Sequence, residues 1–146
     1  MTASPRSVRT RSGAETESLG AQLAGTLSGG DVVLLSGELG AGKTTFVRGA
    51  ARALGVRAAV TSPTFTIGQR YQAAAPLLWV AHLDLYRLGS LAQEDPDLLE
   101  DYLGPQTVTF IEWPAAAERE LHGTLRVARR VTLAHAGGDE RVIEIS

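Results

Sequence analysis

The sequence predicts an α/β domain built as a three-layer sandwich, with a mostly parallel central sheet plus antiparallel hairpin strands. First, the apolar run at 32–35 leads through a glycine-rich loop into a helix-like stretch at 45–54, a strand-loop-helix pattern typical of this fold class. Second, two further apolar runs, at 77–83 and 108–111, each lead directly into an acidic residue. Third, two alternating runs around a glycine turn in the last part of the chain predict a hairpin.

The N-terminal part divides into an arm and the start of the domain. Residues 1–11 contain one proline and three arginines but no periodic apolar face, so we expect a flexible arm there. Residues 12–146 are expected to form a single domain. Leucines recur every four residues from 19 to 27 and predict a helix that ends at the glycines following them, with Ser12 or Thr16 as its N-cap.

The middle of the chain reads as strands and helices in succession. Residues 31–36 predict the first strand, and the helix after the loop should end at Gly55. The stretches 65–71 and 77–83 predict two strands that an alanine-rich turn joins as a hairpin. The acidic segment at 88–103 fits either the solvated face of a helix or a docking surface for a basic partner.

The C-terminal part is predicted to contribute a buried strand, a short helix and the terminal hairpin. Their expected ranges are 108–111 for the strand, 115–121 for the helix, and 125–133 with 141–145 for the hairpin. The hairpin carries the most basic surface of the domain, with arginines at 126, 129, 130 and 141. Protection of an edge strand is the simplest explanation for these charges.

Composition narrows the class of protein. With 146 residues the chain is long enough for one domain with its own core, and 44% apolar and 21% charged residues are ordinary values for a globular protein. A net charge of −2 argues against a broad nucleic-acid-binding surface. Cysteine is absent, which excludes a disulfide framework and a thiol nucleophile. No apolar run approaches 18 residues, so we expect a cytoplasmic protein without membrane contact.

The motif GELGAGKTT at residues 37–45 lies between the first strand and its helix. Glycines at 37 and 42, followed by Lys43 and Thr44, have the spacing of a phosphate-binding loop, which predicts a P-loop NTPase-like fold. Glycine lets the backbone amides wrap around phosphates, Lys43 can reach the β- and γ-phosphates, and Thr44 can bind magnesium. The expected cofactors are therefore ATP and Mg²⁺, contacted by Gly37, Glu38, Leu39, Gly40, Ala41, Gly42, Lys43, Thr44 and Thr45.

The base specificity follows from a single residue. The chain has 14 basic residues, and Lys43 is the one lysine among them. A guanine-specific Asn-Lys-x-Asp motif is therefore absent, so we expect adenine.

Polar residues at the ends of later strands complete the predicted site. Asp84 and Glu112 each follow a buried strand, where a carboxylate can bind magnesium or position water. Thr64 lies in a Ser-Pro turn that fits either an ordinary turn or a switch that senses the γ-phosphate. His82 alternates with Asp84 and is expected to be a structural hydrogen-bonding residue, and Trp113 either joins the core or covers the site.

Four motifs carry a resemblance to a known family. GELGAGKTTFVRG, SPTFTI, HLDLYRL and IEWP follow one another between residues 16 and 114. In this order and at these separations they resemble the bacterial TsaE family, also called YjeE, whose members are small P-loop ATPases needed to make threonylcarbamoyladenosine in tRNA. The resemblance implies an accessory protein that binds a complex of TsaD and TsaB, reaches tRNA through that complex, and supports its multiple turnover by hydrolysing ATP.

The resemblance also implies roles for individual residues. Lys43 and the glycine loop would bind phosphates, and Thr44 and Glu112 would bind magnesium. Asp84 would support the metal or the water, so that Lys43, Asp84 and Glu112 are the expected catalytic residues and Thr44, Asp84 and Glu112 the expected metal site.

Three further positions belong to the nucleotide site by the same resemblance. Thr64 would belong to a switch-like segment, Trp113 would lie at the site, and Arg141 would approach the nucleotide base. No arginine finger is evident in the chain, so we expect a magnesium-dependent ATPase with low intrinsic activity that partners stimulate. A small-molecule P-loop kinase and a nucleotide-dependent switch or binding module are the alternatives.

Overall fold

The computed structural model describes residues 5–61, 68–73, 78–86, 100, 102–121, 123 and 125–146. In chain order the elements are β1 (Arg6–Thr10), α1 (Gly13–Ala24), β2 (Val32–Gly37), α2 (Lys43–Ala53), β3 (Gly68–Gln72), β4 (Trp79–Asp84), β5 (Thr107–Glu112), α4 (Ala115–Glu120), β6 (Val127–His135) and β7 (Arg141–Ile145). Within the described ranges, no helix is long and apolar enough to cross a membrane.

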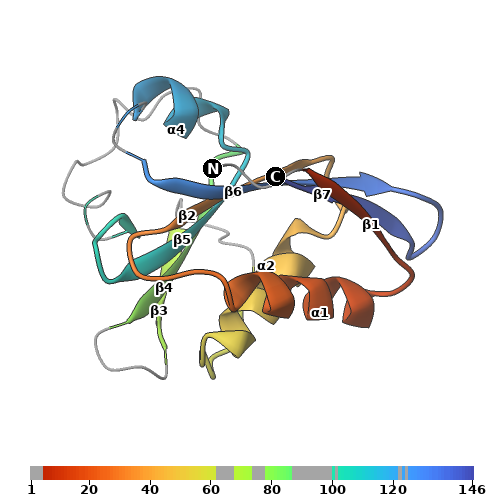
Figure 1. The fold of residues 1–146 in the computed structure, drawn as a ribbon, viewed down its shortest axis with the longest axis horizontal. Coiled ribbons are helices and arrows are strands. Elements are labelled where there is room, and N and C mark those ends of the chain that lie inside the picture. Colours follow the sequence, from red (N-terminus) through yellow and green to blue (C-terminus); the bar gives the residue numbers. More distant parts are fainter. Residues whose placement is uncertain are drawn as a thin grey trace.

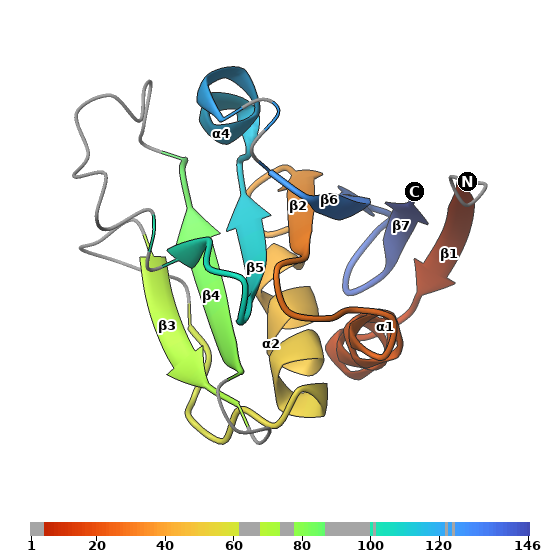
Figure 2. The same cartoon turned by 60° about the vertical axis from the view of Figure 1, so that its left-hand side comes forward.

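One seven-stranded sheet runs through the molecule in the order β1-β7-β6-β2-β5-β4-β3. The strands β6, β2, β5 and β4 are parallel neighbours, whereas β3, β7 and β1 each pair antiparallel (Figures 1 and 2). The carboxyl ends of the four parallel strands therefore meet at one edge of the sheet, where ligands bind in folds of this class. The expected parallel sheet with antiparallel hairpin strands is confirmed.

Helices cover both faces of the sheet, so that the helices and the sheet together form three layers (Figure 1). Strand β2 contributes side chains to both faces of the sheet, because successive side chains of a strand point to opposite faces. Val33 and Leu35 join the larger core beneath α1 and α2, whereas Val32 and Leu34 join the smaller core with Ala117 of α4. The helix that follows the glycine loop is thus anchored on the more extensive apolar face.

Two glycines allow α1 and α2 to pack in backbone contact. A Cβ atom on Gly49 of α2 would lie 1.9 Å from the carbonyl oxygen of Glu17, and one on Gly20 of α1 would lie 2.2 Å from that of Phe46. Ser12 caps α1 as predicted, since its hydroxyl accepts a hydrogen bond from the Glu15 amide at 3.2 Å. The start of α1 lies beside the glycine loop, because a Cβ on Gly13 would meet Thr45 at 3.9 Å.

The N-terminal arm is the main correction to the sequence-based expectations. Residues 6–10 were expected to belong to a flexible arm over 1–11, but they form β1, which pairs with β7 from Arg6↔Ile145 to Thr10↔Arg141. Backbone hydrogen bonds to β7 hold this segment in place, and its polar side chains do not predict such pairing. Val8 also packs against the larger core.

Element boundaries shift elsewhere by a few residues. Helix α1 ends at Ala24, before Leu27, the last of the regularly spaced leucines. It ends there because the amide and hydroxyl of Thr26 both donate to the Leu23 carbonyl. The predicted hairpin of β3 and β4 is confirmed from Gly68 onward. The predictions for the acidic segment at 88–103 lie almost entirely outside the described residues.

The terminal hairpin is confirmed, but the explanation for its arginines is wrong. Strand β6 pairs with β2 and β7, and β7 pairs with β6 and β1, so neither strand is an edge of the sheet. Arg126 pairs with Asp31, and Arg130 with Glu118. Arg141 donates to the Gly40 carbonyl of the glycine loop, and Arg129 donates to the Ala128 carbonyl.

Candidate functional site

The glycine loop turns sharply between β2 and α2. Gly37 and Gly42 have φ angles of 149° and 100°, in the region that favours glycine. A Cβ on Gly37 would also lie only 2.4 Å from the Leu133 carbonyl oxygen of the neighbouring β6. Gly42 is the N-cap of α2 and has no side chain there, so the first amides of the helix are left facing the loop.

Lys43 is buried at the start of α2, with 5% of its surface exposed. Its ammonium donates hydrogen bonds to the carbonyl oxygens of Gly37 and, at 3.1 Å, Glu38, and lies 4.1 Å from the centre of the Trp113 ring. Burial lowers the pKa of Lys43, although the carboxylates of Glu112 and Asp84 oppose that effect. The site therefore holds a partly desolvated cation whose contacts are neutral groups.

The two predicted acids lie side by side at the ends of β4 and β5. Asp84 is in register with Glu112 across the parallel pair, because the two strands end at the same level. The Thr44 hydroxyl donates to Glu112 Oε2 at 3.1 Å, and His82 Nε2 contacts the same oxygen. With 3% exposure, Glu112 is a buried carboxylate that these two donors hold in place. Asp84 Oδ1 accepts the Tyr86 amide at 3.0 Å.

The arrangement of Thr44 and Glu112 fits a magnesium ion. Neighbouring ligands of an octahedral Mg²⁺ at ~2.1 Å lie about 3.0 Å apart. The 3.1 Å between Thr44 Oγ1 and Glu112 Oε2 is close to that spacing, and both are oxygen ligands of the type that Mg²⁺ prefers. Glu112 Oε1 makes no hydrogen bond within the described ranges, so one carboxylate oxygen is available to a ligand.

The hairpin of β6 and β7 holds the other side of the glycine loop. Arg141 donates to the carbonyl oxygens of Gly40 at 3.0 Å and Ala41 at 3.1 Å, and His135 Nε2 lies 3.3 Å from the Leu39 carbonyl oxygen. Because these carbonyl oxygens face the hairpin, the backbone amides of the loop lie on its opposite side. The sequence places these partners about a hundred residues apart, which is why spacing alone did not indicate the contact.

Trp113 forms a cover next to Lys43 and is half-buried. Its φ angle of 56° is unusual for a residue other than glycine, and its amide bonds to the Leu35 carbonyl at 3.2 Å. The exposed ring of Tyr86 packs on it, with the ring centres 4.9 Å apart. Of the two predicted alternatives, core or cover, Trp113 therefore takes the second. Nothing in the sequence indicates that Tyr86 packs on Trp113.

Most of the predicted residues gather around one cavity of about 320 Å³. Its lining consists of Leu39, Gly40, Gly42, Lys43, Thr44, Thr45, Asp84, Glu112, Trp113 and Arg141. Gly37 and Glu38 instead line a neighbouring cavity of about 590 Å³, and Ala41 is buried. Thr64 lies outside the described residues. His82 was expected to be structural, and it is fully buried behind Glu112.

Comparison with known proteins identifies the family of this chain. The family model described as threonylcarbamoyl adenosine biosynthesis protein TsaE matches residues 10–143. A protein of that name from Bacillus subtilis is 38% identical over 92% of this chain and 81% of its own length. The one from Streptomyces coelicolor is 46% identical over 70% of each chain.

A solved structure extends the similarity to the fold. The crystal structure of Bacillus subtilis YdiB superposes with a TM-score of 0.71 and 31% identity, covering 99% of this chain and 86% of that one. The chain therefore belongs to the TsaE family of threonylcarbamoyl adenosine biosynthesis proteins.

Proposed function

We propose that this protein is a magnesium-dependent ATPase with low intrinsic turnover. It serves the threonylcarbamoyladenosine modification of tRNA in the cytoplasm, binds a complex of TsaD and TsaB, and supports repeated turnover of that complex. The observation that carries the ATPase proposal is the contact between Thr44 of the glycine loop and Glu112 of β5, 68 residues away in the chain. That contact joins the phosphate-binding half of the site to its acidic half.

The chain's own groups divide the work of hydrolysis. Lys43 exchanges its carbonyl contacts on Gly37 and Glu38 for oxygens of the β- and γ-phosphates, where its charge offsets the charge that develops in the transition state. Glu112 or Asp84 orients the attacking water, and His82 keeps the Glu112 carboxylate in place. A bound magnesium ion, held by Thr44 and the acids, would neutralise phosphate charge at this position.

Low intrinsic turnover follows from the charges around the cavity. Among the described residues, Arg141 is the arginine that lines the cavity, and its nitrogens already bond to the loop's carbonyl oxygens and to those of Gly138 and Glu140. It is therefore engaged in holding the loop and is not free to follow charge that develops on a γ-phosphate. A partner that supplies a cation or closes the site would raise the rate.

Two variants test the ATPase proposal. Glu112→Gln should slow ATP hydrolysis about a hundredfold, because it removes the charge that orients water, yet change ATP affinity less than about threefold. Lys43→Ala should abolish measurable nucleotide binding. Glu144→Gln is the matched control, because Glu144 is an exposed glutamate of β7 outside the cavity. Unchanged hydrolysis in Glu112→Gln would reject the assignment.

The partner proposal needs a separate experiment. Purified TsaD and TsaB should be retained by the immobilised chain, and adding them should raise its rate of phosphate release. An isolated rate equal to that of the assembled complex would contradict partner stimulation. Transfer of the γ-phosphate to an added small-molecule acceptor, with little free phosphate released, would favour a kinase instead.

A further inference from the structure

A second cavity lies at the opposite end of α1 from the glycine loop. It has a volume of about 320 Å³ and is lined by Arg6 of β1, Gln22 and Leu23 of α1, Thr26, Arg129 of β6, and Ile145 and Ser146 at the end of β7. Helix α1 has 12 residues and is therefore about 18 Å long. Since its first turn touches the loop and its last turn lines this cavity, the two sites are separated by roughly that length.

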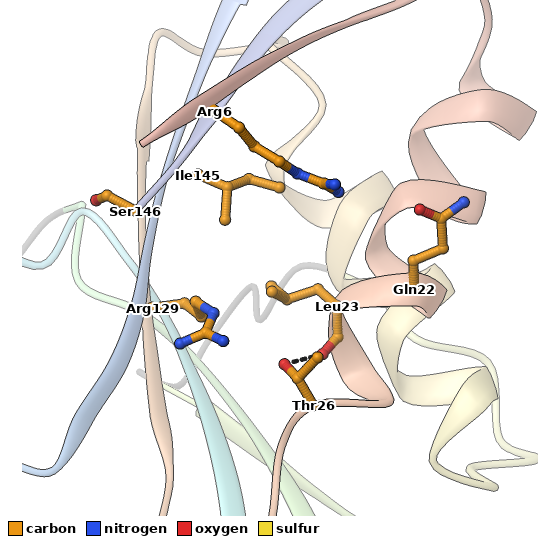
Figure 3. A pocket seen from close by; sticks show the side chains of 7 residues that line it. All are labelled: Arg6, Gln22, Leu23, Thr26, Arg129, Ile145 and Ser146. Carbon is orange, nitrogen blue, oxygen red and sulfur yellow. Dashed lines mark hydrogen bonds between the residues drawn. The ribbon is translucent and has the colours of Figure 1, made fainter. Parts of the chain in front are cut away.

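Two guanidinium groups dominate the chemistry of this cavity. Figure 3 shows Arg6 and Arg129 reaching into the space between the sheet and α1 from two sides, with Leu23 and Ile145 between them. No aspartate or glutamate is among the lining residues. The Gln22 amide adds a further donor, whereas the Thr26 hydroxyl already donates to the Leu23 carbonyl at 2.7 Å.

Neither guanidinium has an acidic partner within the described ranges. Among the described residues, ion pairs with carboxylates are formed by Arg9, Arg48, Arg52, Arg126 and Arg130. Arg129 instead donates one hydrogen bond to the Ala128 carbonyl at 2.8 Å, which leaves most of its five donors unused. Two guanidinium groups without an ion-pair partner, in a cavity lined by no acidic side chain, provide a site for anionic groups.

We infer that this cavity binds an acidic segment of a protein partner, in which two carboxylate side chains flank an apolar one. The carboxylates pair with Arg6 and Arg129, and the apolar side chain packs on Leu23 and Ile145, which matches the order of charge and apolar surface in Figure 3. A nucleic-acid backbone fits less well, because it needs a wide basic surface. The neighbouring Arg9 is already paired with Glu140, and the net charge of the chain is −2.

Peptide binding to the full chain tests this inference without reference to nucleotide. The probe is a labelled nonapeptide whose centre is glutamate-leucine-glutamate, flanked by serine and glycine, and the readout is fluorescence anisotropy. An exposed charge pair contributes up to about 1 kcal/mol, or about fivefold in affinity. Arg6→Gln and Arg129→Gln should therefore each weaken binding about three- to fivefold, and the double variant about nine- to twenty-five-fold if the effects add.

Three controls make the result specific. Arg57→Gln removes one positive charge from an exposed arginine outside the cavity and should leave peptide affinity unchanged. Replacing the two glutamates of the peptide by glutamine, or its leucine by serine, should weaken binding to the unaltered chain. ATP affinity should be the same in all of these protein variants, so a failure of this inference is distinguishable from a failure of the ATPase proposal.

Two outcomes would overturn the inference. Equal peptide affinity in the Arg6→Gln, Arg129→Gln double variant and in the unaltered chain would show that the cavity is not the binding site. If a single-stranded oligouridylate bound more tightly than the peptide and lost affinity in the same double variant, the cavity would be a nucleic-acid site instead.

Discussion

Replacing Gly49 by alanine should break the contact that sets α1 against α2. The added Cβ would lie 1.9 Å from the Glu17 carbonyl oxygen, about 1.5 Å short of the 3.4 Å at which ordinary contact begins. The position of a Cβ is fixed by the backbone and its partner is a backbone carbonyl, so no rotamer change can relieve the clash, and the helices must separate. Overpacking costs about 3 kcal/mol or more in such a case, against a gain of about 1 kcal/mol in helix propensity. We expect a net loss of at least about 2 kcal/mol.

Thermal unfolding followed by circular dichroism measures this loss. At roughly 3–4 °C per kcal/mol for a chain of this size, Gly49→Ala should lower the Tm by at least about 6–8 °C. Gly13→Ala is the matched control, because a Cβ there meets Thr45 at an ordinary 3.9 Å. It should leave the Tm unchanged or raise it slightly. A Tm for Gly49→Ala within about 2 °C of the unaltered chain would refute the reasoning.

Three further predictions concern the site itself. Burial lowers the pKa of Lys43 below its usual 10.5, so the folded state loses this proton before the unfolded state does and stability rises with pH through that window. Lys43→Met should therefore have a larger free energy of unfolding than the unaltered chain at neutral pH, as measured by urea unfolding. The difference should shrink as the pH rises towards 10.5, and a difference that stays the same at every pH would contradict this. Arg141→Gln should weaken ATP binding several-fold in calorimetry, whereas Arg57→Gln should not, because two carbonyls of the loop lose a charged donor. His82→Leu should slow hydrolysis at least about tenfold with little change in ATP affinity, and His82→Gln should restore part of the rate, because glutamine can still donate to Glu112.

The glycine-loop half of the candidate site could be predicted from the sequence because its residues are neighbours in the chain. The spacing from Gly37 to Thr44 determines which atoms can face a phosphate, and the structure places Lys43 and Thr44 in one cavity. The acids were found through a weaker rule, that parallel strands end at a common edge. That rule placed Asp84 and Glu112 correctly at neighbouring strand ends.

The contacts of the hairpin could not be predicted in this way. Arg141 and Gly40 are 101 residues apart, and nothing in their local sequence indicates that β6 pairs with β2. Strand β1 could not be predicted for a related reason, since Val8 is its apolar contact with the core and its order comes from backbone pairing with β7. Propensity and periodicity describe side chains, and they say little about a strand whose stability comes from its neighbour.

The order of the sheet gives the two flanks of the glycine loop different effects on nucleotide chemistry. On one flank, β5 reaches the loop through the Glu112 to Thr44 contact, at the position where the γ-phosphate and its water would lie. On the other flank, β6 and β7 reach it through bonds from His135 and Arg141 to the loop's carbonyls. Changes on the hairpin side should therefore act on affinity, because they alter how the loop presents its amides. Changes on the β5 side should act on turnover, because they alter the groups beside the reacting bond.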